Sequence, residues 1–123
     1  MAHNDKVQLT AVIIAPPDQV EEGDRIFLGH APWMESTHQR SGSKALLSYN
    51  LAKVPELSNP WDLNSAPTGR VCFILTEIYE TRDGVTDHLE RSSSWGDFGA
   101  LAKWMEKCQV TFVPAAPIIH SLW

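Results

Sequence analysis

Residues 69–101, GRVCFILTEIYETRDGVTDHLERSSSWGDFGAL, decide the fold, because an alternating segment is followed by a turn signal and then by a helical pattern. One face of the alternating segment carries Val71, Phe73, Leu75 and Glu77, and the other carries Cys72, Ile74, Thr76 and Ile78. A spacing of two among β-branched and aromatic residues predicts a β-strand. The strand is expected to end at the turn signal of residues 80–84, ETRDG, and a helix is expected to follow.

Three polar side chains fall where this strand ends and the helix begins. Glu77 and Tyr79 lie near the end of the strand, and His88 lies in the first turns of the helix. We therefore expect a carboxyl group, a phenol and an imidazole to meet at the mouth of one pocket.

Length and composition favour one domain and argue against several classes of function. The chain has 123 residues, of which 43% are hydrophobic, enough for a modest core. A net charge of −5 without a basic run argues against nucleic-acid binding. No apolar run approaches the ~20 residues that span a bilayer, and the start of the chain is unlike a signal peptide. With Cys72 and Cys108 interpreted as reduced structural thiols, we expect a cytoplasmic protein that does not bind membranes.

The first third of the chain predicts a strand and a helical region. Residues 6–15 alternate in the manner of a strand that is apolar on both faces in its second half. A three-to-four spacing then continues to His38, but Pro32 interrupts it. Because proline removes a hydrogen bond and clashes with the preceding turn, we expect two short helices or one helix kinked at Pro32.

A second strand and a long loop are predicted next. Residues 44–51, KALLSYNL, form the strand, and residues 52–69 are rich in proline, asparagine and serine, which predicts a loop. Loops of this length are often functional. Trp61 in this loop is either a lid, a contact to a partner subunit, or an anchor that holds the loop on its own core.

The last third of the chain predicts a helix, a strand and a tail. Ser94 is expected to cap the helix, with Asp97 as the acidic member of a capping box. The apolar stripe of this helix consists of Phe98, Leu101, Trp104 and Met105. Residues 109–113 form the next strand, and the tail from about residue 114 to 123 contains prolines and ends in IIHSLW, a fifth strand or an irregular end.

The predicted element order is β-α-β-β-α-β over residues 1–123. This order is typical of an α+β domain with the ferredoxin-like arrangement and an antiparallel sheet.

The segment of Thr76, Glu77, Ile78 and Tyr79, followed by Val85, Asp87 and His88, resembles the E-x-(Tyr/Trp)…x-x-His pattern of the antibiotic-biosynthesis-monooxygenase-like proteins. These belong to the dimeric α+β barrel superfamily, in which the sheets of two protomers pack into one barrel. The resemblance implies a homodimer with a pocket between sheet and helices in each protomer. It also implies a cofactor-independent oxidation of a small aromatic, quinol or polyketide-like substrate.

Such a reaction needs a base for a phenolic proton and a polar donor for the resulting oxyanion. His88 matches the family position and is the predicted base, since an unperturbed imidazole titrates near neutral pH. Tyr79 can donate to a substrate oxygen, and Glu77 can orient His88 or act as a base with a raised pKa. Asn50, near the end of the second strand, can hold an oxyanion through its amide. Each of these side chains also has a purely structural interpretation in the sheet or at its edge.

A second group of candidate substrate contacts lies on the first helical region. His30 and His38 are two turns apart, about 12 Å along a helix, which is too far for both to bind one metal ion. Either histidine can line a pocket together with Trp33, or lie on the helix surface. Trp104 is a further candidate contact, although its helical spacing is more typical of a core residue.

Three functions remain open on this basis. The first is the monooxygenase-like enzyme without metal or flavin. The second is a non-catalytic barrel that binds a small apolar ligand. The third is a haem-binding or haem-degrading member of the same superfamily, with one histidine as the axial ligand.

Overall fold

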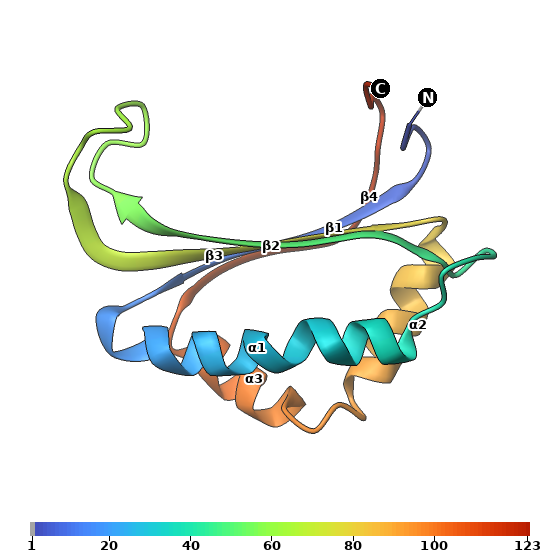
Figure 1. Cartoon of the computed structure of the whole chain (residues 1–123), viewed down its shortest axis with the longest axis horizontal. Coiled ribbons are helices and arrows are strands. Elements are labelled where there is room, and N and C mark those ends of the chain that lie inside the picture. Colours follow the sequence, from blue (N-terminus) through green and yellow to red (C-terminus); the bar gives the residue numbers. More distant parts are fainter. Residues whose placement is uncertain (1) are drawn as a thin grey trace.

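The computed structural model describes residues 2–123 as one four-stranded sheet with helices packed on one of its faces (Figure 1). The elements in chain order are β1 (Val7–Ala15), the 3-10 helix η1 (Pro17–Gln19), α1 (Val20–Thr37), β2 (Leu46–Leu57), β3 (Pro67–Tyr79), α2 (Arg82–Ser92), α3 (Phe98–Glu106) and β4 (Gln109–Pro117). The strand order is β2-β3-β1-β4, and all neighbours are antiparallel. The ferredoxin-like α+β fold is therefore confirmed, with the second helical region divided into α2 and α3.

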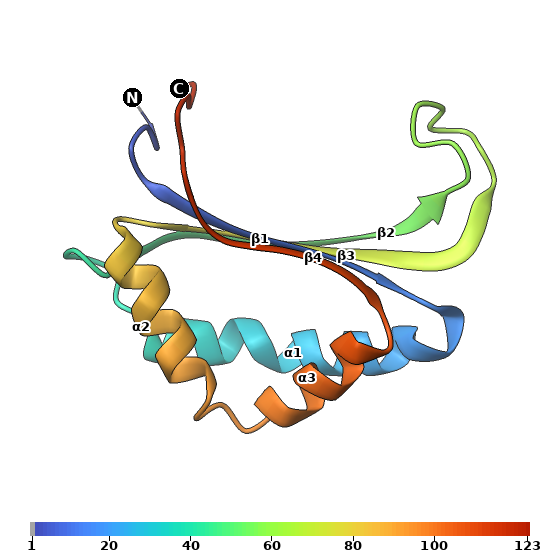
Figure 2. The same ribbon diagram turned by 180° about the vertical axis from the view of Figure 1, so that it is seen from behind.

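The two faces of the sheet differ in what covers them. Helices α1, α2 and α3 lie against one face, whereas the far end of the β2–β3 hairpin and both chain termini rise on the opposite side (Figures 1 and 2). The predicted alternation is confirmed, because the helix-covered face buries Phe73, Leu75, Glu77 and Tyr79 of β3. We call this the inner face and the opposite one the outer face.

The predicted loop over residues 52–69 is wrong in its bounds. β2 continues to Leu57 and β3 already begins at Pro67, so the connection covers only residues 58–66. β2 is an edge strand, where Pro55 removes no hydrogen bond that the sheet needs, and Pro67 stands at the first position of its strand. Trp61 is 96% exposed, which rules out the interpretation as an anchor on its own core.

The predicted tail from residue 114 is also too long. β4 is the other edge strand and runs through Pro114 to Pro117 for the same reason. Residues 118–123 form no strand, but two of them contact the start of the chain. Ile118 forms backbone hydrogen bonds with Asp5 and Lys6, and the Ser121 hydroxyl accepts from the backbone N–H of His3 (3.2 Å).

The structure decides between the two alternatives at Pro32 in favour of one helix, and it corrects two other expectations for the helices. α1 is a single helix through Pro32, because its inner side buries Ile26, Phe27, His30 and Met34, and this packing outweighs the cost of the proline. α2 begins inside the predicted turn, since Thr81 accepts a hydrogen bond from the backbone N–H of Asp83 (3.1 Å). Ser94 caps no helix, and the residue before α3 is Asp97.

Trp104 joins the helices to the sheet within the core. Its ring packs edge-on against Phe27 and Phe73, and its Nε1–H donates to the backbone carbonyl of Gln19 (2.8 Å). No helix among residues 2–123 has the length and apolar character that crossing a bilayer requires.

Candidate functional site

A cavity of about 540 Å³ lies between the inner face of the sheet and helices α2 and α3. We call it the apolar cavity, since its wall is formed mainly by aliphatic and aromatic side chains, among them Leu9, Ile13, Leu101, Met105, Val110 and Phe112. Leu89 of α2, Phe98 of α3 and Phe112 of β4 line it and are each more than two-fifths exposed, so the cavity opens between these elements. Its size suits a small organic molecule.

Two imidazoles are the main polar groups in this apolar wall. His88 projects from α2 and His30 from α1, and both side chains are almost fully buried. Burial disfavours the charged form of an imidazole, and the neighbouring histidines add to the effect. The pKa of His88 is thereby lowered to about 3 and that of His30 to about 4, so both rings are neutral at physiological pH.

The tautomer of His88 follows from a chain of three hydrogen bonds. The Thr37 hydroxyl lies 2.7 Å from the backbone carbonyl of Trp33, which can only accept, so the hydroxyl hydrogen is used there. Thr37 Oγ1 must then accept from Nδ1–H of His38 (2.9 Å). Burial lowers the pKa of His38, and a neutral His38 with hydrogen on Nδ1 has a free lone pair on Nε2. Nε2 of His38 therefore accepts from Nδ1–H of His88 (2.8 Å).

This assignment leaves Nε2 of His88 as an unprotonated nitrogen. It makes no hydrogen bond within the described part of the chain, and the nearest carboxyl oxygen, Oε1 of Glu77, is 3.7 Å away. A free imidazole lone pair in an apolar site is a proton acceptor for a bound substrate.

Glu77 and Tyr79 form a buried pair on β3 beside His88. Neither side chain is exposed, and the Tyr79 hydroxyl donates to Oε1 of Glu77 (2.5 Å). Desolvation raises the pKa of Glu77 to about 7, although the tyrosine hydrogen bond acts in the opposite direction. Burial and the neighbouring carboxylate raise the pKa of Tyr79, so its phenol stays protonated. Glu77 Oε2 is buried without a hydrogen-bond partner among residues 2–123.

His30 is held by Tyr49 from the neighbouring edge strand. The Tyr49 hydroxyl lies 2.7 Å from Nδ1 of His30, and burial raises the pKa of Tyr49, which keeps the phenol neutral. The His30 ring also packs against Trp95, which stacks on Trp33 with 5.6 Å between ring centroids. These aromatic contacts fix the orientation of His30 at the inner end of the cavity.

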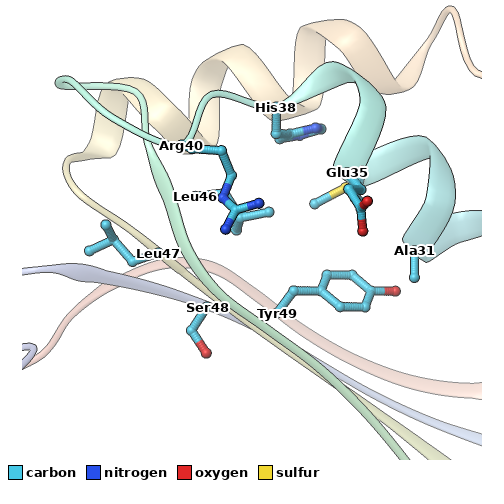
Figure 3. A pocket seen from close by; sticks show the side chains of 9 residues that line it. Ala31, Glu35, His38, Arg40, Leu46, Leu47, Ser48 and Tyr49 are labelled. Carbon is cyan, nitrogen blue, oxygen red and sulfur yellow. The ribbon is translucent and has the colours of Figure 1, made fainter.

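A second pocket, of about 290 Å³, lies between α1 and β2 (Figure 3). We call it the polar pocket, because Glu35 and Arg40 stand in its wall together with His38 and Tyr49. Tyr49 reaches from β2 towards α1, whereas the neighbouring Ser48 points the other way (Figure 3). The two pockets therefore lie on either side of the histidine and tyrosine side chains described above.

The structure brings six of the eight sequence-predicted site residues into one cluster, and their chemical roles stay predictions. These six are His30, Trp33, His38, Glu77, Tyr79 and His88, of which His30 and His88 line the apolar cavity. Asn50 lies apart, because it is exposed and its amide donates to Ser48. Trp104 belongs to the core and is not among the cavity residues.

Sequence reasoning missed Tyr49 and Trp95. The period of two along β2 is the signal for Tyr49. Tyr49 lies two residues before Leu51 and therefore on the same face of the strand, and Leu51 pairs with Leu75 of the inner face. Asn50 points to the outer face, because adjacent residues of a strand point to opposite faces and Tyr49 points to the inner one. Trp95 lies between α2 and α3, where no periodic pattern indicates its direction.

No three or more histidine, cysteine, aspartate or glutamate side chains within residues 2–123 are arranged to hold a metal ion. Comparison with models of protein families and with curated proteins gives no match to this chain, so the assignment of a function rests on the geometry of the site.

Proposed function

We propose that this protein oxidises a small aromatic, quinol or polyketide-like substrate with molecular oxygen, with His88 as the base. The observation that carries the proposal is the free Nε2 of His88 in the wall of a mainly apolar cavity, whose other polar lining residues are His30, Ser92 and Glu106. A phenolic ring fits such a wall, and its hydroxyl would find few other polar partners there.

The chemistry is balanced without an added reductant. Nε2 of His88 takes the phenolic proton, and the electron-rich anion transfers electrons to oxygen. One oxygen atom becomes a new carbonyl on the ring, the other leaves as water with two hydrogens, and the substrate supplies all four electrons. The phenolate would itself favour the imidazolium of His88, because opposite charges in contact stabilise each other.

His30 is the proposed donor to the substrate oxyanion. In the tautomer that we propose, the Tyr49 hydroxyl donates to Nδ1 of His30, and the hydrogen of His30 lies on Nε2, where a ligand in the cavity can accept it. Asn50, which the sequence suggested for the oxyanion, is exposed and donates to Ser48. Tyr79, which the sequence suggested as a donor to a substrate oxygen, already donates to Glu77. Its proposed role is to position Glu77 beside His88.

The test is oxygen uptake with a panel of quinols and hydroxylated polycyclic ketones, followed by product analysis. His88→Ala should reduce turnover by about a hundredfold or more, the usual contribution of a general base. His120→Ala is the matched control, since this histidine is exposed and is not a cavity residue. Ligand-dependent thermal shifts without oxygen uptake would favour a binding protein instead, and a Soret band in the purified protein would favour haem.

We also propose that two copies of the chain pair through the outer face. The support is a set of apolar side chains on that face, which lie among polar ones such as Thr10, Asn50 and Thr76. The apolar residues are Val12, Ile14, Val54, Cys72, Ile74, Ile78 and Val113. Helices cover only the inner face (Figure 1). Trp61 and Leu63, at the end of the hairpin that rises on the outer side, are almost fully exposed and would contact the partner.

A further inference from the structure

Two hydrogen-bonded pairs connect the apolar cavity with the polar pocket. In the first pair His88 lines the apolar cavity and His38 lines the polar pocket, with 2.8 Å between their ring nitrogens. In the second pair His30 lines the apolar cavity and Tyr49 lines the polar pocket, at 2.7 Å. Each pair thus has one member in each wall.

We propose that His38 and His88 form a proton relay, and that the polar pocket is the place where this relay exchanges protons with water. The purpose of the relay rests on the proposed function, in which His88 takes a proton from a substrate. Its existence can be tested without a substrate.

The apolar cavity favours a relay once the phenolate that would pair with a charged His88 has passed its electrons to oxygen. A proton that arrives at Nε2 of His88 creates an imidazolium next to aliphatic side chains, where a charge is costly. His88 can return to the neutral form by passing its Nδ1 hydrogen to Nε2 of His38. One proton then enters at Nε2 and one leaves at Nδ1, and the reverse movement supplies a proton to the oxygen that departs as water.

The outer end of the relay lies in the wall of the polar pocket, which His38 lines. A protonated His38 can pass its Nδ1 hydrogen to the hydroxyl of Thr37 at 2.9 Å, while that hydroxyl turns its own hydrogen from the Trp33 carbonyl to water, since Thr37 is half-buried at the end of α1. The exposed, charged side chains of Glu35 and Arg40 line the same pocket and keep water at its mouth. Figure 3 shows both side chains in the space between α1 and β2.

The pair of His30 and Tyr49 is the weaker candidate for this role. Tyr49 makes no hydrogen bond beyond His30 within the described residues, so the chain of donors and acceptors ends at its hydroxyl. The two histidines continue to Thr37, and an imidazole can accept a proton on one nitrogen while releasing one from the other.

The test measures how fast the Nδ1 hydrogen of His88 exchanges with water, by NMR of protein labelled with ¹⁵N-histidine. In the wild-type protein Nδ1 of His88 should carry the hydrogen. His38→Gln offers a carbonyl oxygen as acceptor but cannot pass a proton on, so exchange should slow by roughly tenfold or more at unchanged stability to urea. Exchange as fast as in the wild type would overturn the relay.

A matched pair of cavity-filling variants tests the route even if His38→Gln fails to fold. Ala31→Phe narrows the polar pocket, and Ala102→Phe narrows the apolar cavity, both from exposed helix positions. The relay predicts slower exchange only in Ala31→Phe. Slower exchange only in Ala102→Phe would show that protons reach His88 through the apolar cavity, which contradicts the proposal.

The result separates the relay from the proposed enzyme activity. Exchange that depends on His38, in a protein that consumes no oxygen with any substrate, would keep the relay and remove the monooxygenase. Turnover that depends on His88, with exchange independent of His38, would do the opposite.

Discussion

Glu77 is a carboxyl group that the fold has taken fully out of water. Only one of its oxygens is hydrogen-bonded, to Tyr79, and the other has no partner among residues 2–123. A charge in such a place is costly, which is why burial raises the pKa of Glu77 to about 7. The neutral acid carries its hydrogen on Oε2, since Oε1 already accepts from Tyr79.

The pH dependence of stability should reveal this group. Between pH 4.5, the ordinary value, and about 7 the folded chain keeps a proton on Glu77 that the unfolded chain has lost. The contribution of Glu77 to the free energy of unfolding should therefore fall as the pH rises through this window, by up to about 1.4 kcal/mol per pH unit. We expect the difference between wild type and Glu77→Gln, measured by urea unfolding, to decline with pH and to level off above about pH 7.

The wild type must be compared with Glu77→Gln, because the buried histidines change the stability with pH in the opposite direction to Glu77. The pKa values of His30 and His88 are lowered to about 4 and 3, so the unfolded chain binds more protons than the folded chain below pH 6.5. Their contribution to stability is lost as the pH falls through this range. Both terms are common to the wild type and Glu77→Gln and cancel in the comparison.

Tyr79→Phe provides a second arm of this experiment. It removes the hydrogen bond that lowers the pKa of Glu77. The pH range over which the stabilising contribution of Glu77 declines should therefore extend to higher pH. If the wild-type advantage over Glu77→Gln instead grew with pH, Glu77 would be an ionised partner of a charged His88, and the proposed neutral base would be wrong.

At the scale of elements, the contact of α1 with the sheet depends on one glycine. A Cβ atom at Gly23 would lie 2.5 Å from Cζ2 of Trp104 and 2.9 Å from Cζ of Phe73. Both rings are fully buried and packed against each other, so they cannot move without disturbing the core.

Gly23→Ala should therefore destabilise the protein by about 1–3 kcal/mol, as overpacking of a core does. Gly29→Ala on the same helix is the control, because its Cβ would meet only Asp97 Oδ2 at 3.7 Å, an ordinary contact. This variant should be stabilising by about 0.5–1 kcal/mol, since alanine loses less entropy in a helix. Urea unfolding of both variants checks the prediction, and equal effects would contradict the close packing of α1.

The same scale shows how far the elements could be predicted. The alternation in residues 71–79 predicted β3 correctly, because the burial of one face of a strand requires apolar residues at every second position. The ends of β2 and β4 could not be predicted, since a proline is tolerated only if its strand lies at an edge, and the strand order decides that. α1 passes Pro32 for a similar reason, which is the packing of its inner side.

For the whole molecule, the uncovered outer face of the sheet is the feature that indicates a partner. Aliphatic side chains of β1, β2 and β3, among them Val12, Val54 and Ile74, lie on it beside threonines. No element among residues 2–123 packs over it in Figures 1 and 2. A sheet usually needs at least one packed face, and an apolar second face marks an interaction surface.

The proposed homodimer predicts that Ile74→Lys will dissociate the protein into monomers. Ile74 lies on β3 near the middle of the outer face, where a buried lysine would be unpaired. Leu28→Lys is the control, because Leu28 is 80% exposed on α1. Analytical ultracentrifugation should give a dimer for the wild type and Leu28→Lys, and a monomer for Ile74→Lys. A monomeric wild type would contradict the proposed pairing.

The sequence by itself determined the element order, the two faces of β1 and β3, and the position of Glu77, Tyr79 and His88 at one end of the sheet. All three follow from the local periodicity and the direction of the chain, which can be read from each segment without knowledge of the others. Only the tertiary structure decided that His38 meets His88 and that Tyr49 meets His30. Those contacts join α1 to α2 and to β2, and their geometry depends on how the helices pack on the sheet, which no single segment specifies.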